Sequence, residues 1–163
     1  MLSDQELTEW VRYVPSGLPK NNVTASFTRT AKLSIRWNVG IRDETLHIFY
    51  PDYLREAPCN VIMDIAKQVI QRALYDSDAK LSQETVDWLK DELRKPENVQ
   101  IFCDRNRFQI MRQYNDAVVV TSEGDVVDTF ILFRVIEIPR KMAESPEIDK
   151  IIEREYESMF LEA

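Results

Sequence analysis

His47 is the only histidine in this chain of 163 residues, so any histidine-dependent reaction must use it. It stands in the run Thr45 to Tyr50 (TLHIFY), where it alternates with Leu46 and Ile48 and therefore faces away from them. Neither a G-x-S-x-G sequence nor a cysteine motif accompanies it. We expect a partly exposed strand histidine; the alternative is a pH-sensitive or catalytic group.

Acidic side chains suggest a second chemistry, the binding of a hard cation. Asp64 and Gln68 are four residues apart, so on a helix they share one ridge and could hold such an ion through water. Asp76 and Asp78 precede a predicted helix, where acids are expected from the helix dipole alone, and they lack the spacing of a calcium loop. We predict no metal and no cofactor. Asp64, Gln68, Asp76 and Asp78 are the alternative metal site.

Cysteines and glycines exclude further classes of protein. Cys59 falls on an apolar helix face, so Cys59 and Cys103 are predicted to be buried reduced thiols and not a disulfide. The three glycines, Gly17, Gly40 and Gly124, cannot build a phosphate-cradling loop, which argues against common nucleotide-binding folds.

The longest helical pattern, Pro58 to Leu74 (PCNVIMDIAKQVIQRAL), positions Asp64 and Gln68. At about 100° per residue, its apolar side chains cover an arc of about 220°. An arc that wide does not fit a surface helix with one buried stripe. We therefore predict a central helix that other elements cover on most of its circumference.

Strand patterns precede this helix. A capping box of Ser3 and Glu6 opens a first helix. Apolar residues then alternate with polar ones in three segments, Val23 to Phe27, Leu33 to Ile41 and Thr45 to Tyr50. We interpret the three strands as an antiparallel meander with one covered face.

The second half of the chain mixes helices and strands. Ser82 is predicted to cap a helix that Pro96 ends. Ala117 to Thr121 and Val126 to Ile138 flank a polar turn and predict a hairpin, although its apolar run from Phe130 also fits a buried helix. The expected fold is α+β, in one domain over residues 1–163, with a C-terminal hairpin and helix.

Charge and hydropathy limit the partners. The net charge of −7 disfavours nucleic acid, because phosphate binding needs clustered lysine and arginine. No apolar window on the order of 18 residues and no signal-peptide pattern occurs, so we expect a cytoplasmic protein without membrane contact. A final helix capped by Ser145 combines an apolar stripe with an acidic face. That face is most simply solvated; alternatively it docks on a basic partner, or the stripe pairs with a second copy.

The run TLHIFYPDYLREAP, followed by NVIMDIAKQVIQRAL, resembles the SprT-like (minigluzincin) family of small zinc metallopeptidases. In that family a meander of strands leads to a helix that carries H-E-x-x-H, and the resemblance covers Leu33 to Leu74. Asp64 and Ile65 stand where the family has its first histidine and glutamate, and Gln68 stands where it has the second histidine. A catalytic zinc needs about three protein ligands, and isoleucine cannot act as a general base. We predict no zinc peptidase activity.

These observations predict a non-catalytic globular protein, a pseudoenzyme relative of SprT-like peptidases. Its function would be interaction with a protein partner or self-association. The alternative is a metal-dependent hydrolase that uses Asp64 with Asp76 or Asp78. A cleft shared by these carboxylates would favour the hydrolase, whereas a packed environment would favour the non-catalytic protein.

Overall fold

A computed structural model describes residues 1–29, 35–40, 42–93 and 95–106, with side chains up to Arg105 except at positions 99, 102 and 103. Beyond these it describes the backbone of four strands within 109–139. Residue contacts divide the chain into two compact units, and each is described by itself. The fold class is α+β, as predicted from the sequence.

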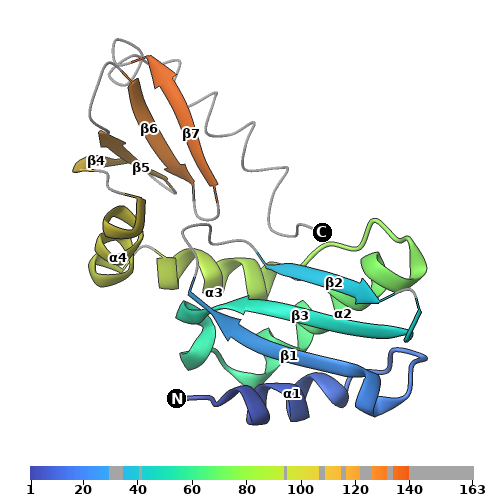
Figure 1. The fold of residues 1–163 in the computed structure, drawn as a ribbon. Coiled ribbons are helices and arrows are strands. Elements are labelled where there is room, and N and C mark those ends of the chain that lie inside the picture. The colour runs from blue at the N-terminus through green and yellow to red at the C-terminus, as the bar shows by residue number, and fades with distance from the viewer. Residues whose placement is uncertain are drawn as a thin grey trace. The chain divides into compact units, whose positions relative to one another are not determined.

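The first unit contains three helices, two short 3-10 turns and three strands (Figure 1). In chain order these are α1 (Asp4–Arg12), η1 (Lys20–Asn22), β1 (Val23–Thr28), β2 (Arg36–Gly40), β3 (Thr45–Pro51), η2 (Asp52–Glu56), α2 (Cys59–Tyr75) and the beginning of α3 (Gln83–Leu93). The predicted capping box is present at the start of α1, where the Ser3 hydroxyl accepts a hydrogen bond from the Glu6 amide. The predicted central helix is confirmed as α2.

The sheet of this unit has the strand order β1-β3-β2. β2 and β3 form an antiparallel hairpin, but β1 runs parallel to β3, with Val23 opposite Leu46. The antiparallel meander expected from the sequence is therefore wrong for β1. Apolar alternation fixes which face of a strand is buried, but it carries no information on which strand lies beside it.

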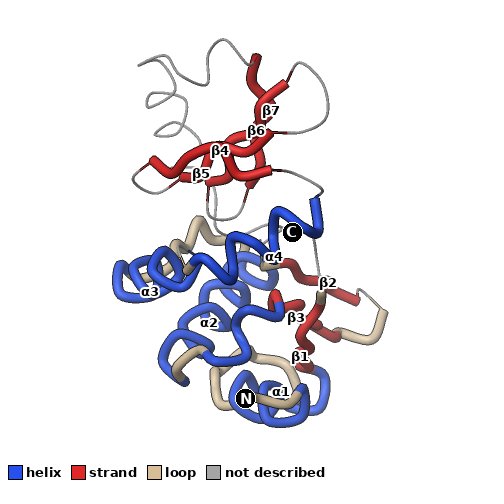
Figure 2. Tube along the Cα trace, turned by 90° about the vertical axis from the view of Figure 1, so that its left-hand side faces the viewer, coloured by secondary structure: helices blue, strands red, loops and turns tan. Residues whose placement is uncertain are grey.

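One face of the sheet is buried, as predicted. Alternate residues of β1 and β3 are buried, and these are Val23, Ala25, Phe27, Leu46, Ile48 and Tyr50. Figure 2 shows α2 lying along one face of this sheet. The fully buried Tyr50 donates a hydrogen bond of 2.9 Å to the Ile62 carbonyl of α2, which fixes helix to sheet. Burial, and then the charge of Asp64, raise the pKa of Tyr50 well above its usual value.

The outer side of β1 is closed by α1. Asp4, Thr8 and Arg12 follow one another at intervals of four residues, so they share one helix ridge. Thr8 Oγ1 donates to the Ala25 carbonyl at 2.8 Å and accepts from the Ala25 amide at 3.1 Å. Arg12 Nε donates to the Val23 carbonyl at 2.9 Å, and Asp4 Oδ1 accepts from the Phe27 amide at 3.0 Å. We call these three side chains the α1 clip, because they occupy backbone groups that would otherwise pair with another strand.

The second unit continues α3 and adds α4 (Pro96–Asn106) and four strands, β4 (Gln109–Tyr114), β5 (Ala117–Thr121), β6 (Val126–Ile131) and β7 (Arg134–Pro139). The strands form an antiparallel sheet in chain order, so the predicted hairpin is confirmed as β5 and β6.

Two details of this half differ from the expectation. The apolar run from Phe130 to Ile138 belongs to two strands and not to one. α3 ends at Leu93, and Pro96 begins α4, where the missing amide of a proline costs no helical bond. The predicted helix after Ser145 lies outside the described residues.

Candidate functional site

His47 lies on the sheet face opposite the buried one, as its alternation predicts. Its neighbours across the ladders are Thr24 on β1 and Asn38 on β2, and Arg36 lies opposite Phe49. We call the side chains of this face the polar sheet face; they are Thr24, Ser26, Thr28, Arg36, Asn38, Thr45, His47 and Phe49. Each of them is partly or largely exposed.

Two hydroxyl groups hold the His47 ring. Nδ1 lies 2.5 Å from Thr24 Oγ1, and Nε2 lies 2.8 Å from Ser26 Oγ. The Phe49 ring packs beside it, with 4.5 Å between the ring centroids. A neutral histidine has one donor and one acceptor nitrogen, so a hydroxyl on each side satisfies both. The sequence signal for these partners is the alternation of Thr24 and Ser26 with the buried residues of β1.

The protonation of His47 follows from its surroundings. Desolvation by burial lowers the pKa of the ring, and the charge of Asp4 raises it less, so the pKa lies below its usual value. The neutral ring is therefore the form at neutral pH. Ser26 and His47 have the spacing of a nucleophile and a base, but the third group is the Thr24 hydroxyl and not a carboxylate. The group of His47, Thr24 and Ser26 therefore holds a neutral histidine by hydrogen bonds and lacks the carboxylate of a catalytic triad.

Asp64 lies elsewhere, on α2, where it caps the next helix. Its Oδ2 atom accepts hydrogen bonds of 3.0 Å from both the amide and the hydroxyl of Ser82. Its Oδ1 atom accepts one of 3.2 Å from Gln68. The Ser82 hydroxyl also accepts the Thr85 amide at 3.3 Å, which confirms Ser82 as the N-cap of α3. Asp64 and Gln68 do share a ridge, as predicted, and both oxygens of the carboxylate are engaged in structural contacts.

The same ridge holds the start of α3 at a second point. One turn before Asp64, Asn60 Nδ2 donates a hydrogen bond of 2.9 Å to Glu84 Oε1. Ile65, which stands at the position of the SprT-like glutamate, is fully buried in the core. Among the described residues, this part of α2 therefore packs against its neighbours.

Asp76 is not brought to Asp64. Asp76 caps the C-terminal end of α2 in the left-handed conformation (φ 47°), and the side chains of Asp76 and Asp78 are exposed. Twelve residues of helix separate Asp64 from Asp76, which is about 18 Å along the axis. One ion cannot contact both carboxylates. Within the described residues, no group of three or more histidine, cysteine or acidic side chains is arranged to hold a metal.

Cys59 corrects another expectation. It is exposed and not buried, because it occupies the first turn of α2, and its Sγ lies 3.5 Å from Met63 Sδ. The position lies at the margin of the apolar arc, where only the following turns are covered. The side chain of Cys103 is outside the described part.

Hydrogen bonding decides the charge of Asp64. Burial alone raises the pKa of this carboxyl, but hydrogen bonds from Thr85, Ser82 and Gln68 outweigh it, so the pKa lies below its usual value of 3.8. Since the folded pKa is depressed, the stabilisation is present above the unfolded pKa and is lost as the pH falls through the folded pKa.

We therefore expect Asp64→Asn to destabilise the protein by about 1 kcal/mol at neutral pH, as loss of a helix cap does. The difference in melting temperature between the variant and the natural protein should shrink below about pH 4. Asp91→Asn is the matched control, since Asp91 is exposed on α3. A difference that stays constant from neutral to acidic pH would show that the charge of Asp64 is not what matters.

Comparison with protein-family models, with curated proteins and with solved structures finds no match for this chain. The resemblance to SprT-like peptidases therefore stays a prediction. No helix among the described residues is long and apolar enough to cross a membrane.

Proposed function

We propose that this chain is a non-catalytic protein that functions by associating with another protein chain, either a partner or a second copy of itself. The observation that carries this proposal is the engagement of Asp64. Its two oxygens accept hydrogen bonds from Gln68 and Ser82, so this carboxylate holds the N-cap residue of α3 in place.

Further contacts support the same function. In the resemblance to SprT-like peptidases, Asp64, Ile65 and Gln68 occupy the positions of the catalytic motif, and here all three serve packing or capping. We also propose that the protein is a relative of SprT-like peptidases that has lost their activity, and that it is located in the cytoplasm. The polar sheet face and the outer side of β2 provide surface for a protein partner. A hydrolase that combines Asp64 with Asp76 fits poorly with the separation of these two residues along α2.

Metal content tests the non-catalytic part of the proposal. The purified protein would be analysed by elemental mass spectrometry before and after dialysis against Zn²⁺, Mn²⁺ and Mg²⁺, with thermal melting alongside. We expect no stoichiometric metal. We also expect no shift in melting temperature, since only an ion that binds the folded state would raise it. Retained metal that Asp64→Asn abolishes would overturn the proposal and favour the hydrolase.

Cross-linking tests the association itself. Treatment of intact cells with a short amine-reactive cross-linker should give one or a few discrete adducts of this chain on a denaturing gel. Light scattering of the purified protein then shows whether the adduct is a second copy. Monomer alone after cross-linking would contradict the proposal.

A further inference from the structure

The three-stranded sheet has two edge strands, because β3 lies between β1 and β2. The outer backbone groups of an edge strand are unpaired and can accept another strand. The α1 clip occupies these groups on β1. Among the described residues, no hydrogen bond joins the outer side of β2 to a side chain or a loop. We call that side of β2 the open edge. The two edges of this sheet therefore differ: side chains of α1 bond to the outer groups of β1, and no such contact is described for β2.

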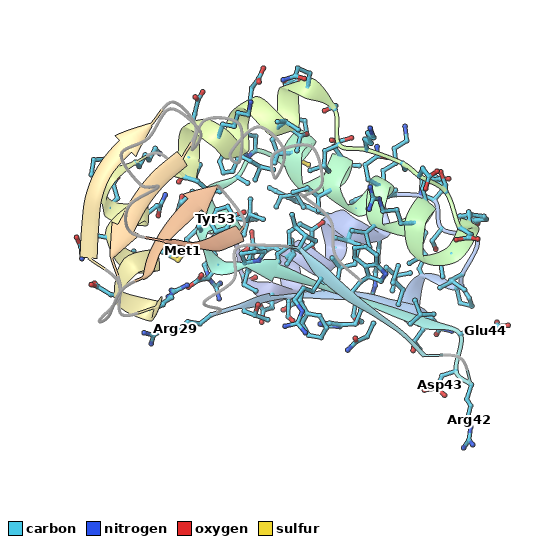
Figure 3. All side chains as sticks on the ribbon, turned by 90° about the horizontal axis from the view of Figure 1, so that it is seen from above. Met1, Arg29, Arg42, Asp43, Glu44 and Tyr53 are labelled. Carbon is cyan, nitrogen blue, oxygen red and sulfur yellow. The ribbon has the colours of Figure 1, made fainter. Side chains whose placement is uncertain are left out.

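The sequence that contains β2 carries a run of positive charges. From Arg29 to Arg42 every charged residue is a cation, namely Arg29, Lys32, Arg36 and Arg42, in a chain whose net charge is −7. Arg36 is exposed, and it forms no ion pair with any other residue that the structure describes. Figure 3 shows Arg29 and Arg42 at opposite ends of the sheet, with Asp43 and Glu44 beside Arg42 in the hairpin turn. Acidic groups of a partner would thus be attracted most strongly towards the Arg36 end.

Successive residues of β2 point to opposite faces of the sheet, and the two sets differ in polarity. Arg36 and Asn38 belong to the polar sheet face, opposite Phe49 and His47. Val39 belongs to the other face and is 40% exposed, so part of its apolar side chain is accessible at this edge. A strand added beside β2 would place its own side chains alternately next to these two sets.

From these observations we infer that the open edge of β2 binds an extended segment of a partner protein in which acidic residues alternate with apolar ones. The segment adds a fourth strand to the sheet. Its backbone pairs with β2, its acidic side chains lie beside Arg36, and its apolar side chains contact Val39. This inference rests on the proposed function and specifies the chemistry of the partner.

The test uses a short dye-labelled peptide of alternating glutamate and valine, with fluorescence anisotropy as the readout on the full chain. Two peptide controls separate the contributions. One carries N-methyl groups on alternate residues, which remove the backbone donors that strand addition needs; the other has lysine in place of glutamate. We expect only the unmodified acidic peptide to bind.

Variants locate the site. Arg36→Glu should weaken binding about tenfold, because attraction becomes repulsion. Lys67→Glu makes the same change on the exposed side of α2 and should leave the affinity unchanged. Melting curves would show whether the reversed charge impairs folding. If it does, Arg36→Ala replaces Arg36→Glu, and we expect a smaller loss of affinity for it.

Three results would overturn the inference: no binding of the acidic peptide, equal binding of the N-methylated peptide, or equal loss in Arg36→Glu and Lys67→Glu. If the peptide does not bind but cross-linked adducts form in cells, the proposed function stands and the partner uses another surface. If the purified protein dimerises and the dimer competes with the peptide, a second copy is the occupant and the acidic partner is excluded.

Discussion

Replacing Ile65 with glutamate is expected to unfold most of the protein at neutral pH. Ile65 is fully buried on the inner side of α2. Loss of a buried isoleucine side chain costs about 2 to 5 kcal/mol, and a buried carboxylate without a partner adds several kcal/mol more. The sum approaches the whole stability of an ordinary domain, about 5 to 15 kcal/mol. Chemical denaturation followed by circular dichroism measures the loss, with Lys67→Glu on the same helix as the control.

The same variant tests the relation to zinc peptidases. The triple change Asp64→His, Ile65→Glu and Gln68→His rebuilds H-E-x-x-H on α2. We expect it to be no better folded with Zn²⁺ than without, because the glutamate would enter the core and the cap of α3 would be lost. A cooperatively folded triple variant that melts higher in Zn²⁺ would mean that this face of α2 opens to a cleft. Position 65 would then face that cleft and not the core.

Thr8→Val is expected to destabilise the protein by about 2 kcal/mol, or about 6 °C in melting temperature. Valine has the shape of threonine, but it leaves both the amide and the carbonyl of Ala25 without the hydroxyl that now bonds to them. Thr28→Val is the matched control, since Thr28 lies on β1, the strand that Thr8 contacts, and its side chain is partly exposed on the polar sheet face. Equal melting temperatures for the two variants would show that the α1 clip contributes little to stability.

The sequence predicted several elements whose signal is local, but not α4 (Pro96–Asn106) or β4 (Gln109–Tyr114). The capping box of Ser3 and the N-cap of Ser82 are each decided within a single turn, and both are present. Alternation predicted the buried and open faces of β1 and β3, including the side on which His47 lies.

Features that depend on remote partners were not predictable in this way. The parallel pairing of β1 with β3 joins segments more than twenty residues apart, and nothing in either segment encodes the neighbour. Asp64 could be placed on a polar ridge of α2, but its role depends on Ser82, which a loop brings back to that ridge. Exposure of Cys59 depends on how far the covering elements extend over the first turn of α2.

The α1 clip would also limit how far the proposed association can proceed. A sheet with two free edges can add a copy on each side and grow without limit, as fibres do. With β1 closed, the three-stranded sheet keeps one edge, β2, at which it could accept a strand, so growth through this sheet would stop once that edge is filled. Asp4, Thr8 and Arg12 would thus limit the proposed strand addition through this sheet to a finite complex.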